Sequence, residues 1–345
     1  MKPKVAITLG DPAGIGPEIV AKTLADPQIY RICNPLVVGD RHAMLMGIKV
    51  SGCDLKINSI EKPTQASYSL GTIDLIDLKN IDPKKIVMGK PAAMTGAASA
   101  EYVIHATDLA LAGEVDAIVT APLNKEALHM GGYNYPGHTE LLAERSGSKN
   151  YAMMLATENL RVVHVTTHIP LRDIVKHLTT QRIHTTIHIA QNACKTLGID
   201  EPRIAVAGLN PHSGDGGLFG DEEERIIKPA IKKALEEGLK VDGPIPPDTV
   251  FCKAVGGQYD IVVALYHDQG HIPIKLQGMK YDEVLGRWES ISGVNITLGL
   301  KFIRTSVDHG TAYGKAGRKE GTANPNSLKE AVHYAVKMAK ARKNP

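Results

Sequence analysis

Lys-Val-Ala-Ile-Thr-Leu-Gly-Asp-Pro-Ala-Gly-Ile-Gly-Pro, residues 4–17, begins with a short apolar run and ends in a glycine-rich turn. The run from Lys4 to Leu9 predicts a buried strand that ends at Gly10-Asp11-Pro12. A helix is expected near Pro17, because proline suits the first position of a helix. A strand followed at once by a helix is typical of α/β folds.

The same alternation continues along the chain. Further strands are expected over residues 116–121, 161–167, 203–209 and 260–266. Helices are expected over about 96–112, 181–197 and 221–238, and from Ser327, where Glu330 has the spacing of a capping box. The pattern predicts an α/β fold with largely parallel sheets. Tyr281–Ser292, rich in charge, is expected to be an inserted loop.

Length and composition exclude several classes of protein. The chain has 345 residues, and about 150 residues per domain predicts two domains. A net charge of +3 with 4% aromatic residues argues against a nucleic-acid partner. Apolar runs fall far short of the ~18 residues that a membrane span needs. The four scattered cysteines and the short apolar stretch at the N-terminus are typical of a cytoplasmic protein with reduced thiols.

Three histidines each follow a predicted strand. They are His168, His212 and His267, 44 and 55 residues apart, about one strand–helix unit or a little more. Parallel packing would bring the strand ends to one edge of a sheet, and three neutral imidazoles there would form a divalent-metal site with an open position. Each could instead be only a polar residue that ends a strand. His271 lies four residues after His267, but Pro273 argues against a helix there.

Two further groups of residues suit a small polar substrate. In Gly137–Glu140, His138 offers a proton carrier and Thr139 a hydroxyl, although a loop before a helix N-cap has the same pattern. Lys275, Asn295 and Arg304 suit a small anion such as phosphate or carboxylate, although each alone is typical of a surface position.

Neither common nucleotide-binding fingerprint is present. The loop at residues 10–17 is not Gly-x-Gly-x-x-Gly, and the chain contains no P-loop motif. A small-residue loop, Asp308–Ala312 followed by Gly321–Pro325, would let the backbone approach a ligand.

Seven motifs together resemble the 4-hydroxythreonine-4-phosphate dehydrogenase family and keep its order. They are Gly10–Glu18, Gly137–Glu140, Thr166–His168, Leu209–His212, Tyr266–Gly270, Gly293–Leu300 and Phe302–Ala312. The wider resemblance is to isocitrate and isopropylmalate dehydrogenases, which have a similar first loop and a His-Gly-Ser/Thr-Ala loop before Ala-Asn-Pro. It implies two α/β/α domains with an interdomain cleft, in a homodimer whose subunits share the active site. Residues 1–137 and 300–345 are expected in one domain and 138–299 in the other.

The resemblance also implies roles for individual residues. His168, His212 and His267 would bind a divalent metal, zinc before manganese, magnesium or cobalt. The phosphorylated substrate would contact His138, Thr139, Lys275, Asn295 and Arg304. NAD would lie against His309, Gly310, Thr311, Ala312 and Asn324. The candidates for proton transfer are Lys275, Asp268 and His138.

The implied reaction is NAD-dependent oxidation, with decarboxylation, of a 4-phosphorylated four-carbon 3-hydroxy acid. Gly216–Gly220 and His267–Lys275 look most like the branch that converts 4-phospho-D-threonate or 4-phospho-D-erythronate to dihydroxyacetone phosphate. The alternatives are the 4-hydroxythreonine-4-phosphate dehydrogenase of pyridoxal phosphate biosynthesis and an aromatic dihydrodiol dehydrogenase. A non-catalytic ligand sensor or a phosphotransacetylase-like acyltransferase is less expected, because neither explains the three histidines.

Overall fold

The computed structural model describes residues 1–283, 287–290, 293–318 and 321–343, which divide into two compact units. Unit 1 comprises Met1–Lys149 and Leu300–Lys340, and unit 2 comprises Asn150–Gly299 with the end of the chain from Ala341. The sequence predicted the first boundary at residue 137/138, twelve residues before the one observed. Helix α6 (His138–Ser146) belongs to unit 1, where it packs on α4 (Ala93–Leu111).

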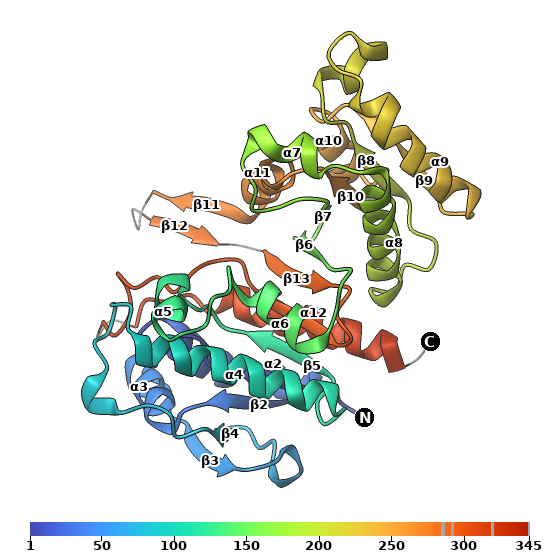
Figure 1. Cartoon of the computed structure of the whole chain (residues 1–345). Helices are drawn as coiled ribbons and strands as arrows, with labels where there is room; N and C mark the ends of the chain where they lie inside the picture. Colours follow the sequence, from blue (N-terminus) through green and yellow to red (C-terminus); the bar gives the residue numbers. More distant parts are fainter. Residues whose placement is uncertain (284–286, 291–292, 319–320, 344–345) are drawn as a thin grey trace. The chain divides into compact units, whose positions relative to one another are not determined.

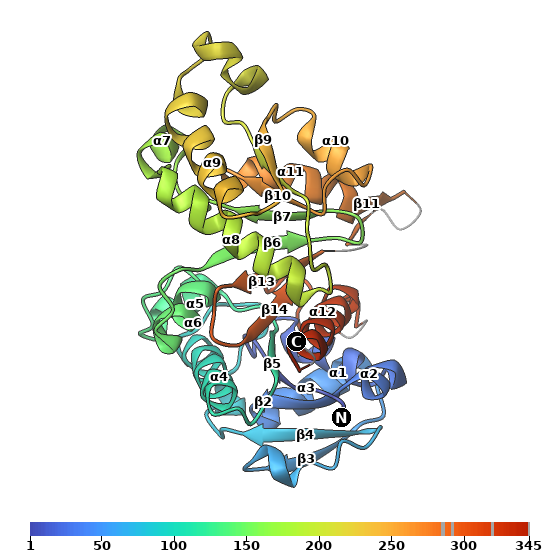
Figure 2. The same cartoon turned by 90° about the vertical axis from the view of Figure 1, so that its right-hand side faces the viewer.

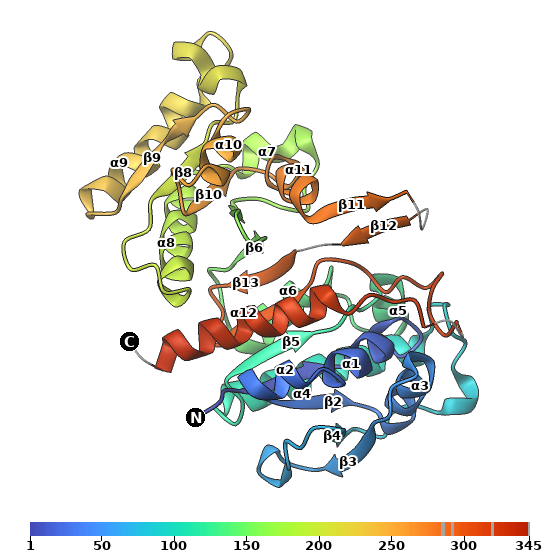
Figure 3. The same ribbon diagram turned by 180° about the vertical axis from the view of Figure 1, so that it is seen from behind.

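Unit 1 contains a wholly parallel run of strands between two layers of helices. The strand order is β3 (Lys56–Ile60), β4 (Thr72–Asp77), β2 (Asn34–Gly39), β1 (Lys4–Thr8), β5 (Ala117–Thr120) and β14 (Ile303–Val307). Helices α4, α5 (Lys125–Met130) and α6 lie in front of these strands in Figure 1. Figure 3, from behind, shows α1 (Gly16–Leu24), α2 (Pro27–Ile32), α3 (Arg41–Ser51) and α12 (Asn326–Lys343) on the other face.

Unit 2 contains a mixed run of strands. The order is β13 (Val294–Leu298), β6 (Ala152–Ala156), β7 (Arg161–His164), β10 (Ile261–Ala264), β8 (Ile204–Ala207) and β9 (Val241–Ile245). Strand β6 is antiparallel to both of its neighbours, and β7, β10, β8 and β9 are parallel to one another. The helices are α7 (Ile174–His177), α8 (Thr180–Thr196), α9 (Lys228–Glu236), α10 (Val250–Val255) and α11 (His267–Gly278). The predicted α/β class with largely parallel strands is confirmed.

Two local predictions were wrong. Pro273 lies inside α11, so the residues from His267 onward are helical. The Tyr281–Ser292 segment is not simply a loop: β11 (Met279–Asp282) and β12 (Arg287–Ser290) form an antiparallel pair, and residues 284–286 and 291–292 lie outside the described part. The last helix is confirmed and begins at Asn326, one residue before the predicted start, and its Ser327 hydroxyl accepts a bond from the Asp308 amide.

The helix predicted over about residues 221–238 is present, but it is not α-helical throughout. A π-helical turn at Glu223–Ile227 precedes α9. Pro229 has no amide hydrogen to donate to residue 225, so the regular α-helical bonding pattern cannot run through this point.

Among the described residues, no helix combines the length and the apolar character needed to cross a membrane.

Candidate active site

The strand ends that carry the predicted metal ligands share one edge of unit 2. Strand β10 lies between β7 and β8 and is parallel to both, so the three carboxyl ends point the same way. His168 follows β7, His212 follows β8 and His267 begins α11 directly after β10. The predicted placement of the three strand ends is therefore confirmed. Ligands of α/β proteins bind at such edges.

Gln269 fixes two of these strand ends to each other. Its side chain is almost fully buried; the Oε1 atom accepts a bond from the Leu265 amide at 2.7 Å, and Nε2 donates to the Gly208 carbonyl at 2.7 Å. The oxygen of the side-chain amide thus binds the end of β10, and its nitrogen binds the residue just after β8. The start of α11, which carries His267, is held in place by these bonds.

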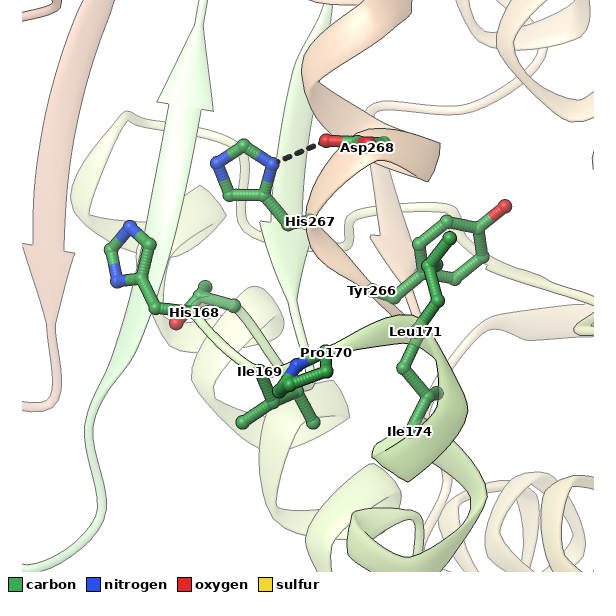
Figure 4. Close-up of a pocket in the computed structure, with 9 residues that line it drawn as sticks. His168, Ile169, Pro170, Leu171, Ile174, Tyr266, His267 and Asp268 are labelled. Carbon is green, nitrogen blue, oxygen red and sulfur yellow. Dashed lines mark hydrogen bonds and ion pairs between the residues drawn. The ribbon is translucent and has the colours of Figure 1, made fainter.

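His168 and His267 face a common cavity (Figure 4). Their ring centroids are 5.6 Å apart, and the cavity, about 420 Å³, has an apolar wall formed by Ile169, Pro170 and Leu171. His267 Nδ1 donates to Asp268 Oδ1 at 2.6 Å. This bond favours the tautomer whose Nε2 carries a lone pair, which is the form of histidine that binds metals.

Two further imidazoles extend this group. The His271 ring stacks on that of His267 with centroids 3.6 Å apart, and the buried His164 ring lies 4.7 Å from His271. Burial lowers the pKa of His164 to about 3, so the ring is neutral at ordinary pH. The sequence predicts no role for His164 and no helix at His271. The signals were a histidine at the end of a buried strand and a second one four residues after His267.

His212 is not among the residues that line this cavity. Among the described residues, the three predicted ligands are not a set whose candidate ligand atoms all lie within 4.8 Å of one another. The backbone from His212 to Gly216 has φ between 42° and 81°, the left-handed region, which is costly for His212, Ser213 and Asp215. The imidazole has the Phe219 ring as a neighbour, with centroids 6.3 Å apart.

A buried carboxylate holds the loop that carries His212. Glu223 Oε1 accepts bonds from the amides of Leu209 and Asn210, each at 2.8 Å, and its Oε2 accepts one from Asn210 Nδ2 at 2.9 Å. Charge-assisted bonds of this kind are the stronger ones in proteins. The π-helical turn places Glu223 beneath this loop, and the sequence analysis gave the residue no role.

Unit 1 contains a buried cation that suits an anionic ligand. Arg304 in β14 is 2% exposed, and its Nη2 donates to Thr120 Oγ1 at 2.6 Å. Burial lowers the pKa of Arg304 to about 9, and the charge of Glu140 partly opposes this shift. The guanidinium therefore remains charged at neutral pH.

His138, at the start of α6, lies near this cation. Burial, and then the charge of Arg304, hold the pKa of His138 well below its usual range, so the ring is neutral. Its buried Nε2 has no partner among the described residues. An unsatisfied buried polar atom is costly, so this nitrogen is available to a water or a ligand. Thr139 is the next residue of the same helix turn, and it belongs to unit 1 together with His138 and Arg304.

The other two predicted substrate residues belong to unit 2. Lys275 lies in α11, two turns after His267. Asn295 lies in β13, where its Nδ2 contacts Met153 Sδ at 3.2 Å.

The loop predicted to contact NAD packs against the first glycine-rich loop of unit 1. Ile15 N donates to Thr311 O at 3.0 Å, and the Tyr313 hydroxyl donates to Asp11 at 2.7 Å. Gly14 is needed there, because a Cβ at this position would lie 3.0 Å from Thr311 Cβ. Thus the stretch His309–Ala312 is held beside the loop that opens α1.

A buried ion pair fixes the end of the same loop. Glu18 Oε1 accepts bonds from Lys22 Nζ at 2.8 Å and from the Ala323 amide at 2.9 Å. Lys22 Nζ also donates to the carbonyls of Gly321 and Ala323. These bonds place Asn324, the residue after Ala323, close to the start of α1.

Comparisons with known proteins identify the family of this chain. A family model described as pyridoxal phosphate biosynthetic protein PdxA matches residues 31–335. D-threonate 4-phosphate dehydrogenase of Salmonella typhimurium is 50% identical, covering 97% of this chain and 98% of its own. 4-Hydroxythreonine-4-phosphate dehydrogenase of Desulforapulum autotrophicum is 44% identical, covering 98% and 96%. The crystal structure of a 4-hydroxythreonine-4-phosphate dehydrogenase from Klebsiella pneumoniae is 46% identical, covers 98% of both chains and has a TM-score of 0.86. The resemblance found in the sequence is confirmed, and the chain belongs to the PdxA family of dehydrogenases, oxidoreductases that act on a CH–OH group.

Proposed function

We propose that this protein oxidises 4-phospho-D-threonate with NAD and converts it, with loss of carbon dioxide, to dihydroxyacetone phosphate. The observation that carries the proposal is the 50% identity, over nearly the full length of both chains, to a D-threonate 4-phosphate dehydrogenase. 4-Phospho-D-erythronate is a second substrate of the same class. The buried cation Arg304 supports a phosphorylated substrate.

In this proposal the residues of unit 1 bind the anionic end of the substrate. Arg304 supplies a fixed positive charge, and a guanidinium matches the geometry of phosphate oxygens. Thr139 supplies a hydroxyl. The unpartnered Nε2 of the neutral His138 makes a hydrogen bond to the substrate and can take up or release a proton there.

The imidazoles of unit 2 are the proposed metal ligands. His168 and His267 face one cavity, and the Asp268 carboxylate accepts a bond from His267 Nδ1 and so keeps Nε2 available, as carboxylates often do for metal-bound histidine. His212 is the proposed third ligand. The donor set suits zinc first, with manganese, magnesium or cobalt as alternatives. When bound, a divalent metal makes the substrate hydroxyl more acidic and stabilises negative charge on the oxidised product.

The remaining predicted residues have proposed roles in proton transfer and orientation. Lys275 or Asp268 accepts the proton released by the hydroxyl and returns one to the decarboxylated product. Asn295 donates to the substrate. Residues 309–312 and Asn324 form the proposed contact with NAD, which accepts the hydride.

NADH formation at 340 nm tests the proposal. The metal-loaded protein is given 4-phospho-D-threonate, 4-phospho-D-erythronate and 4-phosphohydroxy-L-threonine in parallel, with NAD and with NADP. We expect the highest kcat/KM for an acid-sugar phosphate with NAD, and release of one carbon dioxide per NADH. No NADH from any of the three substrates, with metal and NAD bound, would contradict it.

A second candidate is the 4-hydroxythreonine-4-phosphate dehydrogenase reaction. Relatives that are 44% and 45% identical carry that name. The substrates differ in one group, a hydroxyl or an amine at carbon 2, so one polar contact can decide between them. Preference for 4-phosphohydroxy-L-threonine in the same assay would favour this candidate.

A further inference from the structure

A second group of metal-ligand side chains lies in unit 2, and the proposed reaction does not use it. His184 and His188 lie one turn apart on α8, and Glu237 follows the last residue of α9. The two helices lie side by side (Figure 2). Among the described residues, this is the one group of three candidate ligands whose ligand atoms all lie within 4.8 Å of one another.

The three ligand atoms form a compact triangle. His184 Nε2 and His188 Nε2 are 3.3 Å apart, and they lie 2.9 Å and 2.6 Å from Glu237 Oε2. Zinc bonds of about 2.05 Å at tetrahedral angles place ligand atoms about 3.3 Å apart. The His–His separation already has this value, so binding would need only a small outward movement of the carboxylate.

The local structure holds these side chains in place. Residues four apart on a helix lie on one face, which is how paired histidines bind zinc in helical motifs. The α9 helix ends at Glu237, where its amide donates to Lys233 O and Gly238 takes a φ of +85°. The His184 side chain is 9% exposed, whereas His188 and Glu237 are 38% and 37% exposed. The group is thus supported on one side and open to water on the other.

We propose that His184, His188 and Glu237 bind a zinc ion that joins α8 to α9, with water as the fourth ligand. The site has the two-histidine, one-glutamate composition of known zinc sites. It shares no residue with the proposed catalytic ligands, so it does not depend on the proposed reaction. Because both helices belong to unit 2, the ion would stabilise this unit.

The test measures bound zinc per chain and its effect on Tm in four full-length proteins. His188→Gln removes one proposed ligand from a partly exposed position, and Glu237→Gln removes the ligand charge. His333→Gln, an exposed histidine of α12, is the matched control. His212→Ala removes a proposed catalytic ligand and leaves the helix site intact. Equilibrium dialysis followed by elemental analysis gives the stoichiometry, and circular dichroism verifies folding.

We expect His188→Gln and Glu237→Gln to bind one zinc fewer per chain than His333→Gln, with affinity at the helix site reduced by about 100-fold or more. Zinc should raise the Tm of His333→Gln and His212→Ala by about 5 °C but leave that of His188→Gln unchanged. NADH formation by His188→Gln should equal that of the control. Equal zinc stoichiometry and equal Tm shifts in His188→Gln and His333→Gln would overturn the proposal and leave a hydrogen-bonded His–Glu–His group.

Discussion

At the scale of single residues, the burial of Arg304 is unusual, because only 2% of this charged residue is exposed. Arg304 donates to Thr120, and the charge of Glu140 favours the charged form of the guanidinium. Burying a cation costs free energy, which nearby polar and negative groups offset. A bound phosphate would add a further group of opposite charge, as the proposed substrate requires.

Arg304→Gln tests this role. The substitution removes the charge but keeps a polar side chain of similar length, so we expect kcat/KM for the phosphorylated substrate to fall by about 10- to 100-fold, from the loss of charged hydrogen bonds. The measurement is steady-state NADH formation, with far-UV circular dichroism to verify folding. A variant with unchanged KM and kcat would show that the guanidinium does not contact substrate.

The cysteines divide into buried and accessible thiols. Burial raises the pKa of Cys33 and of Cys194 to about 12, whereas Cys252 is exposed and Cys53 is half-buried. At pH 8 we expect Cys252 to react fastest with a disulfide reagent and Cys53 more slowly. Cys33 and Cys194 should react only after denaturation, because the thiolate is the reactive form. A Cys252→Ser control should lose the fast phase, and four equally fast thiols in the native protein would contradict the assignment.

The same thiols make stability depend on pH. Both keep their proton in the folded protein up to about pH 12, whereas an unfolded thiol loses it near pH 8.5. Their contribution is therefore fully present below pH 8.5 and is lost as pH rises toward 12, by about 1.4 kcal/mol per pH unit for each thiol. Urea unfolding at pH 8 and pH 10 should show this loss, and Cys194→Ala should reduce it.

At the scale of elements, the loop after β8 depends on the π-helical turn that follows it. Glu223 accepts three hydrogen bonds from Leu209 and Asn210, while Glu224, the next residue, is exposed and pairs with Lys228. Glu223→Ala should lower the free energy of unfolding by about 2–4 kcal/mol, because two backbone amides lose their acceptor, and should reduce kcat. Glu224→Gln should change stability by less than about 1 kcal/mol. Urea unfolding followed by activity assays compares the two, and equal losses would contradict the role of Glu223.

The packing of α11 on β7 is equally specific. A Cβ on Gly270 would lie 2.3 Å from His164 Nε2, and the buried His164 ring has little room to move. Gly270→Ala should therefore push α11 away, lower stability by about 1–3 kcal/mol and weaken zinc binding through His267. Gly314→Ala has no atom within 4 Å of its new Cβ and serves as the control. Unfolding midpoints and zinc titration of the two variants are the measurements; no difference between them would disprove the close contact.

At the scale of the whole molecule, the proposed homodimer needs an apolar surface for its partner. Ile272 and Leu276 lie one turn apart on α11 and are 58% and 78% exposed. Large exposed apolar side chains on one helix face are typical of interfaces. We propose that this face contacts the second subunit.

Leu276→Glu should therefore convert the dimer to a monomer. Light scattering after size exclusion should give about twice 37.1 kDa for the native protein and about 37.1 kDa for the variant. Leu235→Glu, on an exposed position of α9, is the control and should remain dimeric. If the subunits share the active site, NADH formation should fall with the dimer. A native monomer with full activity would contradict the proposal.

The sequence by itself determined the α/β class and the positions of the strands that carry the candidate site. Apolar β-branched runs such as residues 4–8 and 261–264 are most stable as buried parallel strands. The polar residues that follow each run therefore lie at the carboxyl end of the strand. The family followed from motifs that are local in sequence. For this reason His168, His267 and Arg304 could be named before any contact was known.

Only the tertiary structure decided which of these side chains meet. Pairwise distances depend on helix packing, so the stacking of His271 on His267 and the burial of His164 could not be read from spacing. Pro273 was expected to prevent a helix, but packing stabilises α11 despite the hydrogen bond that proline cannot make. The His184–His188–Glu237 group needs two helices side by side, because His188 and Glu237 are 49 positions apart in the sequence, and no local pattern specifies that pairing.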